Sequence, residues 1–249
     1  SRIFSTGNLA IGDDSVAAFN HEGEIIIGQN QLAITSSTRS GLGSLTTLGN
    51  SSGAGTLIAD AGFVLDFDDV MTGYGDIESI NRIDEAIINN GAVIGESLTD
   101  RLVFNGFVKG VGTFENVRFD GTFAPGLSPT ITRGENLAFG GNLEMEIGGL
   151  LRGSEYDAII DSGLLTLGGT LDVVLFNGVS LDVGDTFDLF DWNMLSGSRF
   201  SVLNLPTLES GLGWDTGSLY SNGRLSVSAV PEPGVVSFLM LVGVGLSCR

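Results

Sequence analysis

The chain has 249 residues, of which 38 are glycine, and its acidic side chains outnumber its basic ones to give a formal net charge of -19. Glycine favours turns and disfavours helix interiors, so this composition predicts many short strands joined by tight turns. A surface this acidic has no basic stripe to neutralise phosphates, which argues against nucleic acid as a partner.

The first 60 residues consist of short apolar runs separated by turn residues. Residues 25–27 form one run that ends at Gly28, and residues 32–34 form another that is followed by Ser36. Each run is too short for a helix and is bounded by glycine, asparagine or serine, which is typical of β strands.

A pattern of two glycines separated by one residue then recurs along the chain. It occurs at Gly41 and Gly43, Gly53 and Gly55, Gly73 and Gly75, and Gly110 and Gly112. The later spacings are 20 residues from Gly53 to Gly73 and 37 residues from Gly73 to Gly110. They fit one and two coils of about 18–20 residues, which predicts a solenoid with these glycines at its corners.

Residues 63–68 alternate between apolar and other side chains, a pattern typical of a strand with one buried face. We expect Phe63, Leu65 and Phe67 to face the core. Asp66 and Asp68 would then share the solvent face of the same strand.

Four isoleucines follow at the spacing of a helix face, namely Ile77, Ile80, Ile83 and Ile87. Isoleucine is β-branched and favours strands, and both flanking segments have the pattern of strands. We therefore expect a β-helix coil here, and not a helix.

A series of short motifs extends over residues 105–192. It includes GTFAPGLSP at residues 121–129, Tyr156 with Asp157, LGGTLD at 167–172 and GDTF at 184–187. This series resembles the β-helix passenger domains of autotransporter-like proteins. The resemblance implies a right-handed parallel β-helix that ends in a β cap.

Residues 186–229 have the pattern of closing strands and contain Trp192 and Trp214. Large aromatic side chains mainly serve burial, so we expect both tryptophans to pack in the cap. A sugar-stacking platform is the alternative.

The last twenty residues differ from everything before them. Pro231 and Pro233 flank Glu232 after Val230, and the uncharged apolar run of residues 234–248 leads to Arg249. Prolines break helices and central strands, so residues 230–233 are expected to be an extended linker. As a helix, the apolar run would be roughly 22 Å long, and snorkelling or local bilayer thinning would close the gap to a ~30 Å hydrocarbon core.

This tail resembles the PEP-CTERM sorting signal of bacterial surface proteins. The motif covers Val230, Pro231, Glu232 and Pro233, and the membrane helix covers residues 234–249. The family usually ends in several arginines where this chain has Arg249 alone. The resemblance implies that an exosortase, a membrane transpeptidase, recognises the motif and removes the tail during export, and that a signal peptide directs the chain to the membrane.

Residues suited to catalysis or metal binding are scarce. His21 is the only histidine and is expected at the surface, and the only cysteine, Cys248, lies in the tail. Zinc sites take three or four ligands, mostly His and Cys, and a serine triad would depend on His21 alone. We therefore predict no catalytic residues, no metal site and no cofactor.

Carboxylates are numerous enough to leave acid chemistry open. Pairs on one strand face are expected at Asp66 with Asp68 and at Glu144 with Glu146, and aspartates recur at Asp182, Asp185, Asp188 and Asp191. Two carboxylates about 5–9 Å apart can hydrolyse a glycosidic bond, and oxygen ligands suit Ca²⁺. Solvated surface is the simpler interpretation, because 30 acidic residues must lie somewhere on the protein.

Together these patterns predict an all-β protein. The expected parts are solenoid coils over residues 1–135, a closing β region over 136–229, the linker over 230–233 and the hydrophobic helix over 234–249. The favoured function is a non-enzymatic cell-surface or extracellular-matrix protein of a Gram-negative bacterium, exported, transiently anchored in the inner membrane and processed by an exosortase. The alternative is a β-helix hydrolase or lyase that acts on polysaccharide through an acidic cleft, and an extracellular polysaccharide is a further candidate partner.

Overall fold

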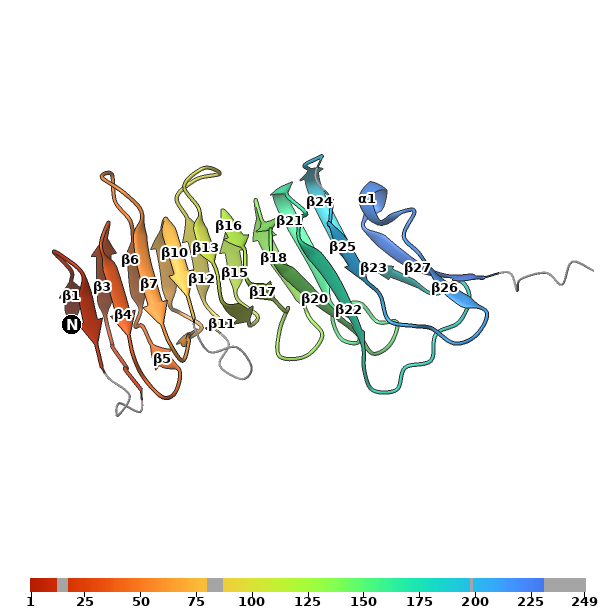
Figure 1. Cartoon of the computed structure of the whole chain (residues 1–249), viewed down its shortest axis with the longest axis horizontal. Coiled ribbons are helices and arrows are strands. Elements are labelled where there is room, and N and C mark those ends of the chain that lie inside the picture. Colours follow the sequence, from red (N-terminus) through yellow and green to blue (C-terminus); the bar gives the residue numbers. More distant parts are fainter. Residues whose placement is uncertain (13–17, 80–86, 198, 231–249) are drawn as a thin grey trace, which may run out of the picture.

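The computed structural model describes residues 1–12, 18–79, 87–197 and 199–230. These residues form an elongated parallel β-solenoid whose coils are stacked along one axis (Figure 1). The only helix within the described ranges is the single turn α1 (Leu219–Asn222). The predicted all-β solenoid is therefore confirmed, and the predicted hydrophobic helix over 234–249 lies outside the described residues.

Three parallel sheets form the walls of the solenoid. Sheet A has nine strands, in the order β1 (Arg2–Phe4), β3 (Glu24–Gly28), β6 (Leu45–Leu48), β9 (Val70–Gly73), β12 (Ala92–Gly95), β15 (Thr113–Glu115), β18 (Ile131–Glu135), β21 (Ala158–Leu165) and β24 (Phe190–Leu195). Sheet B has seven, namely β2 (Leu9–Ile11), β4 (Gln31–Ile34), β7 (Gly55–Ala59), β10 (Gly75–Glu78), β13 (Leu102–Phe104), β16 (Val117–Phe119) and β19 (Ala138–Phe139). Sheet C has eight, namely β5 (Ser40–Gly41), β8 (Phe63–Leu65), β11 (Ile87–Asn89), β14 (Phe107–Lys109), β17 (Thr122–Phe123), β20 (Asn142–Ile147), β22 (Thr170–Leu175) and β25 (Val202–Asn204).

Each complete coil contributes one strand to each sheet in the order A, B, C, from β3, β4 and β5 to β18, β19 and β20. In sheet A, Leu45 pairs with Val70, Val70 with Ala92 and Ala92 with Thr113. Most coils thus take about 20–25 residues, which is longer and less regular than the 18–20 expected from the glycine repeat. The difference arises because corner loops vary in length while the strands stay in register.

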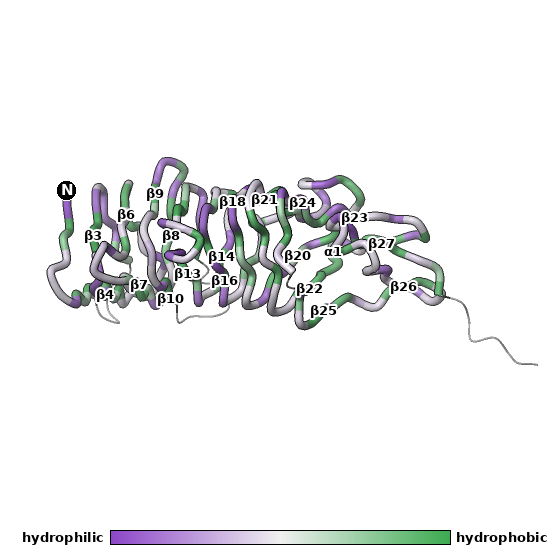
Figure 2. The backbone as a smooth tube through the Cα atoms, turned by 90° about the horizontal axis from the view of Figure 1, so that it is seen from above, coloured by the Kyte–Doolittle hydropathy of each residue, from purple (hydrophilic) through white to green (hydrophobic). Residues whose placement is uncertain are grey.

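Side chains that alternate along each strand fill the interior. In β7, Leu57 and Ala59 are buried, whereas Thr56 and Ile58 lie at the outer face. Figure 2 shows the resulting alternation of apolar and polar segments along the whole body. The middle coils hold a stack of phenylalanine rings whose neighbouring centroids lie 4.4 to 6.4 Å apart: Phe104, Phe114, Phe119, Phe123 and Phe139.

Corners join the sheets, and we name them A–B, B–C and C–A after the sheets that they connect. The paired glycines lie at these corners or at the strand ends beside them, as predicted. At the A–B corner Gly75 has φ +138°, and a Cβ there would collide with the backbone of Gly55 in the preceding coil. Only glycine allows the two coils to approach this closely.

Asparagines form a short ladder at the A–B corner. Asn116 and Asn136 adopt left-handed backbone conformations, with φ 51° and 58°. The Asn136 Nδ2 donates to Asn116 Oδ1 at 2.9 Å, and Asn116 Nδ2 donates to the carbonyl of Gly95 at 3.1 Å. The ladder supplies hydrogen bonds to polar groups at a buried corner, where an unpaired group would cost stability.

An antiparallel sheet closes the C-terminal end of the solenoid. It consists of β23 (Thr186–Asp188), β27 (Arg224–Ala229) and β26 (Leu212–Asp215) in that order. Phe187, Leu219 and Leu225 are fully buried beneath it, and Trp214 packs at its margin with its ring 6.1 Å from that of Phe187. The parallel sheets continue past residue 135 to β24 and β25 before this sheet covers them.

The structure corrects the expected burial of Phe67. Phe63 and Leu65 are buried as predicted, but Phe67 is 85% exposed. The strand ends at Leu65, and a tight turn follows in which Asp69 N donates to the Asp66 carbonyl at 3.0 Å. Asp66 and Asp68 therefore belong to an exposed turn and not to one strand face. Ile77 and Ile87 are buried in strands, as expected, while Ile80 and Ile83 lie outside the described residues.

Candidate functional site

Two of the concavities lined by described residues each contain at least two carboxylates. The first has a volume of about 410 Å³ and lies at the C–A corner of the N-terminal coils. Carboxylates of Glu22, Asp66 and Asp69 line it together with His21. The His21 ring lies parallel to that of Phe19 with centroids 6.2 Å apart, and within the described residues its buried Nε2 has no hydrogen-bond partner. His21 is thus partly covered, and not freely exposed as its sequence context suggested.

The second concavity, of about 400 Å³, lies on sheet B and at the A–B corner. Asp76 and Asp100 both line it, beside Tyr74. Two carboxylates beside an aromatic ring is the arrangement that a polysaccharide-acting enzyme would need. Sequence reasoning missed this pair, because the residues lie 24 positions apart and only the coil register brings them together.

Both carboxylates of the second concavity are already engaged with neighbouring groups. Asp100 accepts hydrogen bonds from Ser97 Oγ at 3.1 Å and Thr99 Oγ1 at 3.2 Å, within its own loop. Asp76 accepts one from Asn105 Nδ2 at 3.4 Å. Asp100 therefore stabilises its own loop, and Asp76 contacts the next coil.

Two arginines flank the same concavity. Arg101 donates to the backbone carbonyls of Leu98 at 2.9 Å and Val117 at 3.2 Å, and also to that of Asn136. Burial, and then the nearby Arg118 guanidinium, lower the pKa of Arg101. Arg118 instead pairs with Asp120 at 2.7 Å, and this hydrogen bond raises the Arg118 pKa. Arg101 therefore braces three successive coils through their carbonyls.

The predicted pair Glu144 and Glu146 does share one face of β20. Both point outward, while Leu143, Met145 and Ile147 between and beside them are buried. Glu144 lies in register with Asp172 on the next strand. Burial raises the pKa of Glu144, Lys109 lowers it, and the carboxylates of Asp172 and Glu146 raise it further. The result is an acidic strip on a sheet face.

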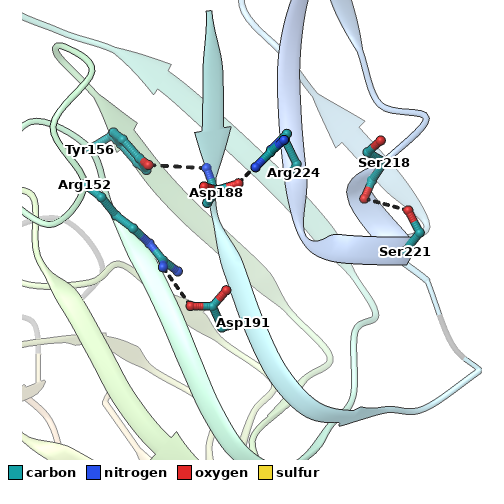
Figure 3. A network of polar contacts seen from close by, with 7 residues as sticks. All are labelled: Arg152, Tyr156, Asp188, Asp191, Ser218, Ser221 and Arg224. Carbon is teal, nitrogen blue, oxygen red and sulfur yellow. Dashed lines mark hydrogen bonds and ion pairs between the residues drawn. The ribbon is translucent and has the colours of Figure 1, made fainter.

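The four regularly spaced aspartates do not converge on one site. Asp182 and Asp185 close a turn in which Asp182 N donates to Asp185 Oδ2 at 2.7 Å. Asp188 pairs with Arg224, and Asp191 with Arg152, each at 2.7 Å. Figure 3 shows the two ion pairs side by side, tying β23 to β27 and β24 to the loop before Tyr156. The first pair therefore stabilises the cap sheet itself, and the second joins two parts of the last solenoid coils.

The burial of two aspartates was not predicted from the sequence. Asp157 and Asp161 are each 1% exposed. Asp157 accepts hydrogen bonds from the backbone N–H groups of Thr130 and Glu146, both at 2.8 Å. Burial raises the pKa of Asp157 to about 7. The two hydrogen bonds from backbone N–H groups lower this pKa, and the nearby carboxylates of Glu146 and Glu144 raise it.

Asp161, four residues later in β21, has a similar role. It accepts hydrogen bonds from the N–H groups of Asn136 at 3.1 Å, Leu137 at 2.6 Å and Gly163 at 2.7 Å. Burial raises its pKa, and the three backbone bonds act in the opposite direction. It thereby positions Asn136, the end of the asparagine ladder.

The predicted sorting motif begins at Val230, the last residue that the structure describes. Val230 follows β27 directly, is 51% exposed, and donates its N–H to the Gly211 carbonyl at 2.9 Å. Pro231, Glu232, Pro233 and Arg249 lie outside the described residues. Over the ranges that the structure describes, no helix has the length and apolar character needed to cross a membrane.

The described part of the chain contains no group of three or more His, Cys, Asp or Glu side chains placed to hold a metal ion. No family model, curated protein or solved structure matches this chain. The structure therefore defines the protein as a parallel β-solenoid closed at its C-terminal end by an antiparallel sheet. Such a fold serves both enzymes and non-enzymes, so function must be argued from the particular sites.

Proposed function

We propose that this protein is a non-enzymatic solenoid of the bacterial cell surface or extracellular matrix, exported and sorted by its C-terminal tail. One observation carries the proposal: β27, the last strand among the described residues, ends at Ala229, and only Val230 separates it from Pro231, Glu232 and Pro233. A processing enzyme needs an accessible, extended segment, and Pro231 and Pro233 disfavour its pairing with a sheet. Cleavage at this position would release a body that keeps every described strand.

The placement of the carboxylates supports a structural role over a catalytic one. Asp188, Asp191 and Asp120 are paired with arginines. Asp157 and Asp161 bind backbone N–H groups in the interior. A general acid must face its substrate, whereas Asp157 and Asp161 are buried and the other three aspartates, though partly exposed, are each paired with an arginine.

The tail would act as a temporary membrane anchor. A helix over 234–248 would have apolar side chains on every face. Lipid would bury all of these faces, whereas docking against the protein would leave some of them in water. Arg249 would stay on the cytoplasmic side, and the acidic body would lie across the membrane. The exosortase-type transpeptidase is the partner that this arrangement requires, in the inner membrane of a Gram-negative bacterium.

The test compares the full chain with a chain that ends at Val230, both expressed with an export signal in a host that lacks an exosortase. We expect only the full chain to fractionate with membranes and to need detergent for extraction. In a host with an exosortase, the full chain should lose mass and leave the membrane, and a chain with Pro231→Ala and Pro233→Ala should not. Equal extraction of both chains without detergent, or processing unchanged by the proline substitutions, would contradict the proposal.

A polysaccharide-acting enzyme is the second candidate, and the concavity that contains Tyr74, Asp76 and Asp100 favours it. We expect the purified protein to show no hydrolase or lyase turnover on bacterial polysaccharides. If turnover is found and Asp76→Asn with Asp100→Asn abolishes it while Asp66→Asn with Asp68→Asn does not, the enzyme hypothesis replaces the structural one.

A further inference from the structure

The concavity of about 400 Å³ on sheet B, which we call the Tyr74 concavity, has a chemically mixed lining. It combines an aromatic ring, two carboxylates, two guanidinium groups, a hydroxyl and apolar side chains. Its volume lies in the range of small-molecule sites, about 300–1,000 Å³. A ligand that matches this lining must offer hydrogen-bond donors, hydrogen-bond acceptors and an apolar face together.

The ring of Tyr74 is held in a fixed position at the A–B corner. Its hydroxyl donates to the carbonyl of Asn50 in the preceding coil at 2.7 Å. The ring lies against Gly49, where a Cβ would come within 2.8 Å of the ring atom Cδ1. Tyr74 is only partly buried, so a ligand in the concavity can reach it. A ring that is already fixed loses little conformational freedom on binding, which favours stacking of a ligand on it.

Outward side chains of three neighbouring strands form the floor of the concavity. Asp76 on β10, Val103 on β13 and Arg118 on β16 are direct register partners, and these strands lie side by side in sheet B (Figure 1). With strands about 4.8 Å apart, the backbones at Asp76 and Arg118 are about 10 Å apart. The floor therefore has an acceptor at one end, a donor at the other and an apolar side chain between them.

The charged groups of the lining keep polar atoms available for a ligand. Arg118 uses Nε for its ion pair with Asp120, and within the described residues no group accepts a hydrogen bond from its Nη1 or Nη2. Asp100 accepts its side-chain hydrogen bonds through Oδ2 alone, and Asp76 through Oδ1 alone. The second oxygen of each carboxylate has no hydrogen-bond partner in the described part of the chain.

We propose that the Tyr74 concavity binds a neutral polysaccharide without cleaving it. Sugar hydroxyls both donate, as Asp76 and Asp100 require, and accept, as Arg118 requires. The C–H face of a sugar ring is apolar and can stack on Tyr74. The lining residues come from four successive coils, at strands β7, β10, β13 and β16, so a chain of sugars that lies along the solenoid axis would contact them in turn.

Two other classes of ligand fit less well. An anion would meet two carboxylates in the lining and the repulsion of a body with a net charge of -19. A peptide that adds a strand needs a free sheet edge, and β10 and β13 are each paired on both sides. The inference rests on the matrix role proposed above and deepens it, because it names the class of matrix molecule that the body would hold.

The test is isothermal titration calorimetry on the full chain, kept soluble in a detergent that has no sugar headgroup. The neutral probes are cellohexaose, laminarihexaose, xylohexaose and mannohexaose, and the anionic probe is hexagalacturonate. Tyr74→Ala removes the ring, Tyr74→Phe keeps the ring without the bond to Asn50, and Arg118→Gln removes the guanidinium. Phe67→Ala and Arg133→Gln remove an exposed ring and an exposed guanidinium outside the concavity and are the matched controls. Circular dichroism checks that each variant is folded.

We expect at least one neutral probe to bind with a dissociation constant below about 1 mM. Tyr74→Ala and Arg118→Gln should each raise this constant at least about fivefold, whereas Tyr74→Phe and the two controls should change it less than about twofold. Because the ligand is neutral, a rise in NaCl from about 50 to about 500 mM should also change it less than about twofold.

Four results would overturn the proposal. They are a lack of binding to every neutral probe, tighter binding of hexagalacturonate than of any neutral probe, equal binding by the unchanged chain, Tyr74→Ala and Arg118→Gln, and cleavage of a bound probe detected by mass spectrometry. Processing of the tail is measured on the same variants in a host with an exosortase. Failure of the binding test with normal processing would overturn the saccharide site alone and leave the sorting proposal standing.

Discussion

The buried carboxyl of Asp157 should make the stability of this protein depend on pH. Asp157 is 1% exposed, and burial raises its pKa from 3.8 to about 7. Between about pH 4 and pH 7, the folded state therefore keeps the Asp157 proton, whereas the unfolded state has released it. The stabilisation is complete below the unfolded pKa and is lost as the pH rises towards the folded pKa.

The magnitude follows from the same two pKa values. A tenfold change in proton affinity corresponds to about 1.4 kcal/mol, so the contribution of Asp157 should fall by about 2–3 kcal/mol between pH 5 and pH 8. The substitution Asp157→Asn removes this titration. It also replaces one of the two oxygens that accept from Thr130 and Glu146 with an N–H donor, a cost of about 1–3 kcal/mol that does not vary with pH.

Urea denaturation of the unchanged chain and the Asp157→Asn variant at about pH 5 and about pH 8 measures the difference. We expect the unchanged chain to be the more stable at pH 5 and its advantage to shrink by about 2–3 kcal/mol at pH 8. Asp68→Asn, at an exposed turn residue, is the control and should keep the pH dependence of the unchanged chain. An advantage over Asp157→Asn that stays constant within about 0.5 kcal/mol across this range would refute the reasoning.

Three further substitutions and one control test the corners and turns, each by urea denaturation of the full chain. Gly75→Ala forces a Cβ against the backbone of Gly55 at φ +138°, and it should lower the free energy of unfolding by more than about 3 kcal/mol or prevent folding. The control Gly178→Ala also has a positive φ but has no neighbour within 4 Å, so its loss should be smaller. Asn136→Ala removes the acceptor of Leu164 N and the bond to Asn116, and should cost about 2–3 kcal/mol; a loss below about 0.5 kcal/mol would show that the ladder is not stabilising. Phe67→Ser should change stability by less than about 0.5 kcal/mol because the ring is 85% exposed, and a large loss would place Phe67 in the core after all.

Much of the fold could be predicted because its local rules are visible in the sequence. Short runs such as residues 25–27 and 32–34 do form strands, and glycines such as Gly75 do lie at corners. The coil length was predicted less accurately, because corner loops differ in length from coil to coil. The prediction that Phe67 is buried was wrong, because a tight turn ends the strand at Leu65. The two-residue alternation of apolar side chains does not indicate where strand pairing stops.

The candidate sites were less predictable than the fold. Glu144 and Glu146 lie on one face because a single strand fixes both, and the two-residue period captures this. Asp76 and Asp100 line one concavity because the coils stack. Asp157 accepts hydrogen bonds in the interior from the N–H groups of Thr130 and Glu146, which are distant in the sequence. Their sequence contexts look like those of any surface aspartate.

The sequence by itself determined the all-β solenoid class and the strand-and-corner pattern, and it predicts a sorting tail. All three depend on local composition, where glycine, proline and alternating apolar residues act through backbone geometry. Only the tertiary structure decided which carboxylates are buried, which are paired with arginine and which line one concavity. These properties depend on the register between coils, and register is set by contacts between residues that lie a whole coil apart.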